Sequence, residues 1–157
     1  MHTTRVSRHV NASPAAVFRA LLDPGAVARW RVPDGMSARV HEFDARQGGR
    51  FRVSLTYDDA GAPGTAGKSD ARTDTYHGHF AELVPDEKVV EVLAFESADP
   101  EFGGTMTMTT SLAAAEDGGT EVLVVHEGLP DAVRPEDNEA GTRMALDNLA
   151  GLVEGGG

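Results

Sequence analysis

The sequence predicts an α+β fold in which a curved antiparallel sheet of about seven strands wraps around one long C-terminal helix, with two short helices after the first strand. Several segments alternate apolar and polar side chains, as half-buried antiparallel strands do. Residues 135–154 instead repeat apolar side chains at helical spacing. A chain of 157 residues has the usual length of one compact domain, so we expect a single domain over residues 1–157.

A strand and two short helices come first along the chain. Residues 3–11 alternate, which favours a strand. Ser13 can cap the helix that follows, and Pro14 suits its first turn, where the missing N–H has no cost. We expect residues 23–25, Asp-Pro-Gly, to end that helix and residues 26–30 to form a second short one.

Six further segments have the pattern of strands: residues 37–46, 49–58, 72–84, 88–97, 105–114 and 120–128. In the second of these, arginine, serine and threonine side chains occupy one face and apolar or aromatic side chains the other. Residues 85–87 and 117–119 suit hairpin turns. Strands of this length twist and curl, so the sheet needs a partner on its concave face.

The segment 135–154 can supply that partner as an amphipathic helix. Its apolar stripe consists of Ala145, Leu146, Leu149, Leu152 and Val153. Acidic residues in its first turns match the positive end of the helix dipole. Such a helix is about 30 Å long, which is comparable to the span of the sheet.

Composition excludes several classes of function. The formal net charge of −11 repels polyphosphate, so we expect neither nucleic acid nor an anionic membrane as a partner. The absence of cysteine excludes disulfides, thiolate nucleophiles and sulfur-ligated metals. Because the chain has neither a signal-peptide pattern nor a run of about 20 apolar residues, we expect a cytoplasmic location.

Several motifs along the chain resemble those of one protein family. They are Ser13-Pro14-Ala15-Ala16-Val17-Phe18 with Trp30, Gly48-Gly49-Arg50-Phe51-Arg52, Gly78-His79-Phe80, Gly118-Gly119-Thr120-Glu121-Val122, His126-Glu127-Gly128-Leu129, and the ending Asn148-Leu149-Ala150-Gly151-Leu152. They resemble the START and polyketide-cyclase superfamily, and within it the branch named for activators of heat-shock-protein ATPase. The resemblance implies the helix-grip fold over nearly the whole chain. It does not choose an activity, because the superfamily includes lipid carriers, hormone receptors, aromatases and cyclases.

One position departs from the branch to which the chain is similar. Members often carry a Gly-Trp pair early in the last helix, whereas here Gly141 is followed by Thr142. The resemblance therefore implies room at a cavity or interface that tryptophan would otherwise fill.

Aromatic, thioether and apolar side chains on the expected inner surface are candidates for a ligand cavity. The candidates are Trp30, Phe51, Val53, Leu55, Tyr57, Tyr76, Phe80, Met106, Met108, His126, Met144 and Leu149. Any of them could equally fill an ordinary core. His126 is the best candidate for acid–base work because imidazole titrates near neutral pH, yet Glu127 should point to the opposite face and cannot orient it.

Two motifs suggest other chemistry, but their context argues against it. Residues 62–69 match a relaxed phosphate-loop pattern, although the preceding strand alternates as a solvent-facing strand does and no helix is expected to follow. His77 and His79 should share a strand face, but no third metal ligand can be named. We therefore expect no bound nucleotide, no metal and no cofactor.

Three functional hypotheses remain open. The first is a non-catalytic protein that holds a small hydrophobic molecule between the sheet and the C-terminal helix. The second, which the branch name implies, is a co-chaperone-like regulator that binds an ATPase partner in a stress response. The third is a cyclase- or aromatase-like enzyme that uses His126. We expect a monomer or homodimer, and no assembled catalytic group.

Overall fold

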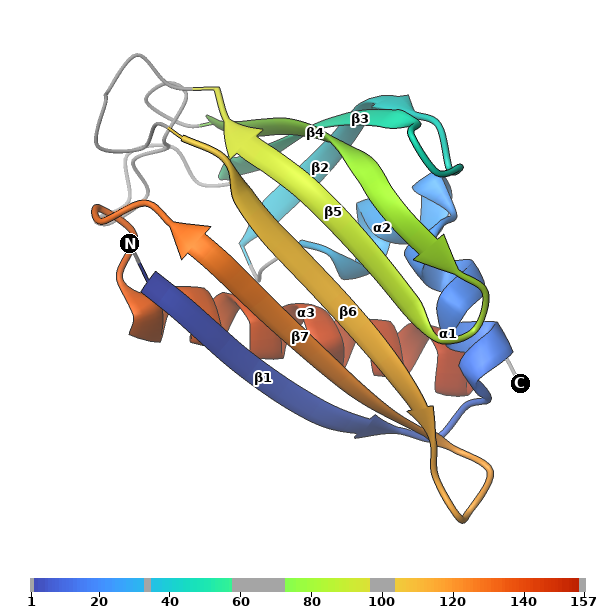
Figure 1. The fold of residues 1–157 in the computed structure, drawn as a ribbon. Coiled ribbons are helices and arrows are strands. Elements are labelled where there is room, and N and C mark those ends of the chain that lie inside the picture. The colour runs from blue at the N-terminus through green and yellow to red at the C-terminus, as the bar shows by residue number, and fades with distance from the viewer. Residues whose placement is uncertain (1, 33–34, 58–72, 97–103, 156–157) are drawn as a thin grey trace.

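The computed structural model describes residues 2–32, 35–57, 73–96 and 104–155 (Figure 1). In chain order its elements are β1 (His2–Val10), α1 (Pro14–Leu21), α2 (Pro24–Trp30), β2 (Met36–Phe43), β3 (Arg50–Tyr57), β4 (Thr73–Val84), β5 (Lys88–Phe95), β6 (Met106–Ala114), β7 (Thr120–Leu129) and α3 (Pro135–Gly155). This order confirms the predicted α+β fold class.

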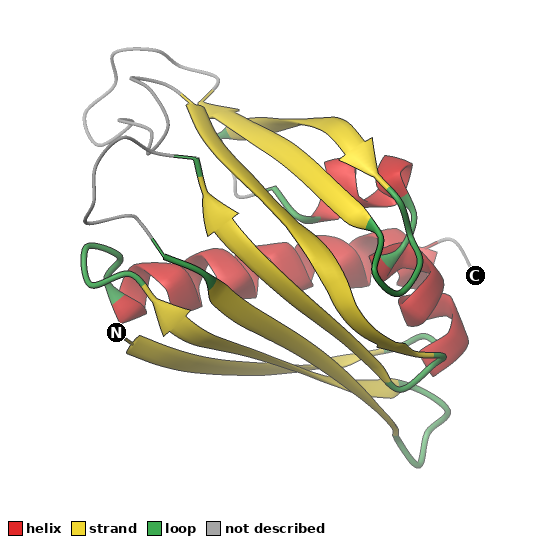
Figure 2. Ribbon diagram, turned by 45° about the horizontal axis from the view of Figure 1, so that its top comes forward, coloured by secondary structure: helices red, strands yellow, loops and turns green. Residues whose placement is uncertain are grey.

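The strands form one curved sheet in the order β1-β7-β6-β5-β4-β3-β2, and each neighbouring pair is antiparallel. Helix α3 lies across the concave face of the sheet (Figure 2). Helices α1 and α2 contact each other and α3, near the C-terminal end of α3. This is the helix-grip arrangement that the sequence predicts.

Helix α2 begins earlier than the sequence predicts. Asp23 is its N-cap, and the carboxylate accepts hydrogen bonds from the backbone N–H groups of Gly25 at 2.9 Å and Ala26 at 3.4 Å. Pro24 occupies the first turn. The Asp-Pro-Gly triplet therefore starts α2 instead of merely ending α1, because a capping aspartate followed by proline is also a helix-start signal.

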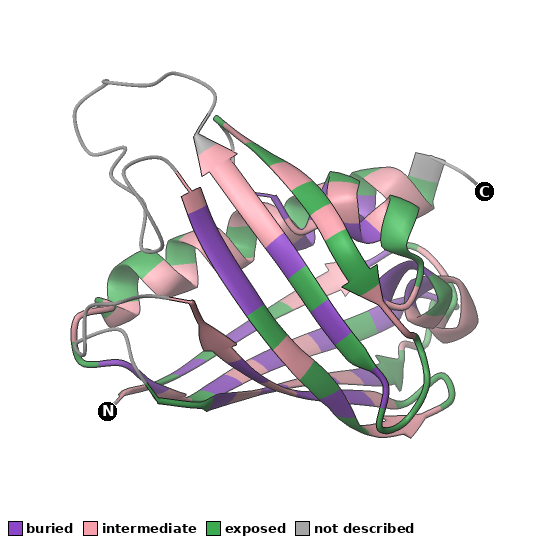
Figure 3. Ribbon diagram, turned by 90° about the horizontal axis from the view of Figure 1, so that it is seen from above, coloured by how far each residue is buried: buried purple, intermediate pink, exposed green. Residues whose placement is uncertain are grey.

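The core lies between the concave face of the sheet and the apolar stripe of α3. Leu146, Leu149 and Ala150 of α3 are buried, and the outer members of the predicted stripe are partly buried. Along the strands, buried and exposed residues alternate (Figure 3). This alternation places one face of each strand against the core and the other in solvent.

Candidate functional site

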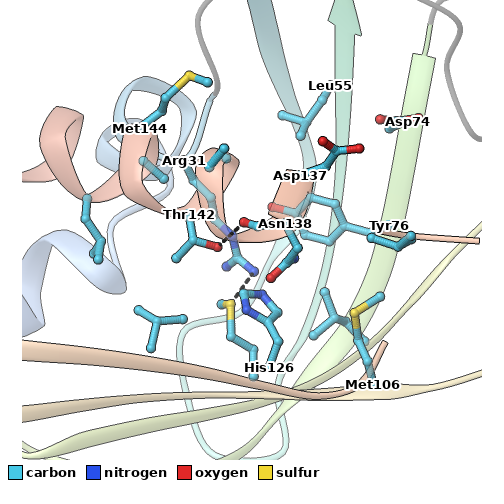
Figure 4. A pocket seen from close by; sticks show the side chains of 18 of the residues that line it. Arg31, Leu55, Asp74, Tyr76, Met106, His126, Asp137, Asn138, Thr142 and Met144 are labelled. Carbon is cyan, nitrogen blue, oxygen red and sulfur yellow. Dashed lines mark hydrogen bonds between the residues drawn. The ribbon is translucent and has the colours of Figure 1, made fainter. Parts of the chain in front are cut away.

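A cavity of about 620 Å³ lies between the concave sheet and α3 (Figure 4). Strands β2 to β7 contribute to its wall on one side, and α3 and the ends of α1 and α2 on the other. Most of the lining is apolar, and includes Trp30, Leu55, Leu93, Met106, Met108 and Met144. The cavity has the size and the character of a small-molecule pocket.

The structure divides the sequence-predicted cavity residues into two groups. The cavity is lined by Trp30, Leu55, Tyr76, Met106, Met108, His126 and Met144. The residues that belong to the packed core and are not part of the lining are Phe51, Val53, Phe80 and Leu149. The side chain of Tyr57 lies outside the described residues.

An aromatic cluster explains why two of these candidates do not reach the cavity. The ring of Phe80 lies 5.4 Å from that of Phe43 and 5.1 Å from that of Phe51, measured between centroids. Such edge-on and tilted contacts fill the interior with ring carbons. Alternation along a strand predicts which side chains point inward, but not where along the strand the packing leaves space.

Arg31 is a cavity residue that the sequence analysis missed. It is the C-cap residue of α2, and its Nη1 lies 2.6 Å from Oε1 of Glu91 on β5. These side chains are only 15% and 5% exposed, so the ion pair is buried. The guanidinium also lies 5.1 Å from the ring centroid of Tyr76, and Nη2 contacts Sδ of Met108 at 3.6 Å (Figure 4).

A signal for this ion pair does exist in the sequence. Glu91 occupies an inward position between Val89 and Leu93, where a strand with one wet side should carry an apolar residue. A buried carboxylate requires a cationic or hydrogen-bonding partner. The strand pattern thus implies a partner for Glu91, but nothing local indicates that the partner is Arg31.

The ion pair influences the ionisation of the buried side chains around it. Burial alone would lower the pKa of the Arg31 guanidinium, but the charge and hydrogen bond of Glu91 outweigh burial and raise it. Burial raises the pKa of the Tyr76 hydroxyl, even though Arg31 acts in the opposite direction. At neutral pH, Arg31 is therefore charged and Tyr76 is neutral.

His126 on β7 lines the same cavity as a neutral imidazole. Burial, and to a smaller degree the positive charge of Arg31, lowers the pKa of His126 from 6.5 to about 4. The residue is 9% exposed. Its Nδ1 and the hydroxyl of Tyr76 are the buried side-chain polar atoms without a hydrogen-bond partner in the described part of the chain. Two such atoms at one cavity are unusual, because buried polar groups are normally paired.

The buried state of His126 predicts a dependence of stability on pH. As the pH falls from 6.5 towards 4, the unfolded chain binds a proton at this residue before the folded chain does, so acid favours unfolding. Between pH 7.5 and pH 4.5 the wild type should lose about 2–3 kcal/mol more free energy of unfolding than a His126→Leu variant. Urea titrations at both pH values measure this difference, and equal losses would contradict it.

The α3 side of the cavity contains the position at which the chain departs from the family that it resembles. Gly141 and Thr142 both line the cavity. A Cβ atom placed on Gly141 would meet no heavy atom within 4 Å. The Thr142 hydroxyl donates a hydrogen bond to the backbone oxygen of Asn138 at 2.8 Å. Open space therefore lies next to Gly141 and Thr142, the two positions that correspond to the Gly-Trp pair.

The other chemical motifs lie away from the cavity. His77 and His79 are exposed on β4, and Nδ1 of His77 is 3.0 Å from Oε2 of Glu96. Within residues 2–32, 35–57, 73–96 and 104–155, no group of three or more histidine or acidic side chains is arranged to hold a metal. Glu127 is exposed while His126 is buried, so the two do point to opposite faces. Residues 62–69 lie outside the described residues.

No helix in the described part of the chain is both long enough and apolar enough to cross a membrane.

The chain is similar to known proteins in both sequence and fold. Residues 11–154 match the family model described as "Activator of Hsp90 ATPase homolog 1-like protein". A crystal structure of a Chromobacterium violaceum protein is 34% identical with a TM-score of 0.83, covering 98% of this chain and 99% of the other. Two further structures share the fold. The one from Rhodobacter sphaeroides is 21% identical with a TM-score of 0.78, covering 98% of this chain and 92% of the other. The one from Silicibacter pomeroyi is 17% identical with a TM-score of 0.77, covering 98% of each chain. No curated protein matches the chain significantly.

Proposed function

The chain belongs to the family of Activator of Hsp90 ATPase homolog 1-like proteins, and we propose that it is a non-catalytic protein that binds a small, mostly apolar molecule between the sheet and α3. The observation that carries this proposal is the cavity of about 620 Å³, which has an apolar lining and a few convergent polar groups. Under this proposal the protein acts in the cytoplasm, as a monomer or homodimer, without a bound cofactor.

The polar groups of the cavity favour binding over catalysis. His126 is neutral down to a pH of about 4, and it has no hydrogen-bonded partner in the described part of the chain that would orient it as a base. The charge of Arg31 is already balanced by its ion pair with Glu91. A cyclase- or aromatase-like reaction would have to use His126 alone, so a His126→Ala variant that lost a measured turnover would support that alternative.

A tryptophan at position 142 should close the cavity. Thr142 lines the cavity from α3, and a much larger indole there would occupy the space that a ligand needs. Adamantane, a compact apolar cage, should bind the wild type and raise its melting temperature. The Thr142→Trp variant should bind it at least about tenfold more weakly by isothermal titration calorimetry, which corresponds to the loss of about 1.4 kcal/mol.

The matched control for this experiment is Arg143→Trp. Arg143 is the next residue on α3, but it is exposed and does not line the cavity. The Arg143→Trp variant should therefore bind adamantane with the same affinity as the wild type. If adamantane binds neither the wild type nor the control, or binds Thr142→Trp equally well, the cavity is not the binding site.

The family description supports a second candidate function, which is regulation of an ATPase by docking on it. The net charge of −11 would favour a basic surface on such a partner. In that case the purified chain should raise the rate of ATP hydrolysis by purified Hsp90, and the effect should weaken as salt concentration rises. An unchanged rate at a large excess of the chain would argue against this candidate.

A further inference from the structure

The imidazole of His126 is a polar group for which the described protein offers no partner. It forms no hydrogen bond with any described residue, and of its two ring nitrogens only Nδ1 is fully covered by protein atoms. Nε2 is therefore the atom that a cavity occupant can reach. Because the rest of this side chain is about nine-tenths buried, a hydrogen bond to His126 from outside the described protein has to be made at Nε2.

An anionic ligand does not suit this cavity. The cation in the cavity wall, Arg31, is already paired with Glu91 at 2.6 Å. A ligand carboxylate near this guanidinium would have to share its single positive charge with Glu91, so two carboxylates would lie close together and repel each other. Asp74 and Asp137 also line the cavity, so its wall already contains acidic side chains.

A cationic ligand is disfavoured beside His126 for a different reason. Figure 4 shows the guanidinium of Arg31 directed toward the His126 ring. Burial and the charge of Arg31 together keep His126 from becoming a cation. A ligand cation at the same place would meet the same desolvation and the same repulsion.

We propose that the ligand is an uncharged, mostly apolar molecule whose hydroxyl group hydrogen-bonds to His126. A neutral imidazole carries its proton on one of its two nitrogens, and a hydroxyl group can complement Nε2 as either donor or acceptor. The rest of the ligand contacts the apolar wall formed by residues such as Trp30, Met106 and Met144. This assignment rests on the binding function proposed above, and it specifies the chemistry of the ligand.

Four adamantane compounds test this assignment, because they share one apolar cage and differ in their polar group. They are adamantane, 1-adamantanol, 1-adamantanecarboxylate and 1-adamantylammonium. Calorimetry at pH 7.5 should show that the alcohol binds the wild type about tenfold more tightly than the other three compounds. Trp30, the single tryptophan of the chain, lines the cavity and should report occupancy through its fluorescence.

Variants of His126 identify the hydrogen-bonding group. In His126→Leu the advantage of the alcohol over adamantane should disappear while adamantane still binds, and in His126→Gln, which keeps a donor and an acceptor, part of it should return. His79→Leu makes the same change on an exposed side chain of β4, and it should leave all affinities unchanged. Circular dichroism verifies that each variant is folded. If His126→Leu does not fold, His126→Gln is compared with the wild type instead. An advantage of the alcohol over adamantane that is as large in His126→Gln as in the wild type would contradict the assignment.

The possible outcomes distinguish a failure of this ligand assignment from a failure of the proposed binding function. If a charged compound binds most tightly, or if the alcohol and adamantane bind equally, the assignment is overturned while the binding function stands. An advantage of the alcohol that survives in His126→Leu also overturns it, because another group must then bind the hydroxyl. If none of the four compounds binds the wild type, the binding function fails, and the assignment fails with it.

Discussion

Replacement of Glu91 by alanine should lower the free energy of unfolding by about 3–5 kcal/mol. Arg31 is 15% exposed and has its ion-pair partner in Glu91, so the substitution leaves a guanidinium buried without a counter-charge. Arg31 caps the end of α2 and Glu91 lies on β5, so loss of the ion pair also weakens the contact between the end of α2 and the sheet. Urea denaturation followed by circular dichroism at pH 7.5 measures the change.

An exposed ion pair provides the control for the Glu91 prediction. Asp44 and Arg46 form a pair whose side chains are 44% and 78% exposed, so Asp44→Ala should leave the melting temperature almost unchanged. Joint replacement of Arg31 by methionine and Glu91 by leucine should recover most of the stability, because no charge then remains buried. A Glu91→Ala variant as stable as the wild type would show that the Arg31 charge finds another partner.

Replacement of Gly78 by alanine should destabilise the sheet by at least about 3 kcal/mol. On β4, Gly78 pairs with Phe51 of β3 and Leu93 of β5. A Cβ atom at this position would lie 2.0 Å from the backbone oxygen of Val92, and a backbone atom cannot move aside as a flexible side chain can. The strands would have to separate, and thermal unfolding measures the cost.

The same substitution elsewhere should have the opposite effect. Gly151 lies in α3, where a Cβ atom would meet no heavy atom within 4 Å. Alanine is favoured over glycine in a helix by about 1 kcal/mol, so Gly151→Ala should raise the melting temperature. If Gly78→Ala also raised it, the close approach of β4 and β5 at this position would not exist in solution.

The fold could be predicted in most of its parts because its signals are local. Alternation in Arg50–Tyr57 and the apolar stripe of α3 each depend on residues a few positions apart, and both elements form where expected. The start of α2 was placed wrongly at Ala26 because Asp23-Pro24-Gly25 contains both a helix-stop and a helix-start signal.

The candidate site was predicted less completely. Inward-pointing residues such as Met106 and Phe80 could be recognised from alternation, but only Met106 borders the cavity, since Phe80 packs in the aromatic cluster. Whether a residue fills the core or lines a space depends on the volumes of neighbours that are distant in the sequence.

The local pattern of side chains was therefore sufficient for the strands, the long helix and the concave sheet, because each of these follows from the periodicity of a short segment. The meeting of Arg31, Glu91 and His126 depended on tertiary structure, since they come from the end of α2, from β5 and from β7. The pKa values of Arg31 and His126 shift because burial removes water and brings charged groups together, and no spacing in the sequence encodes that contact.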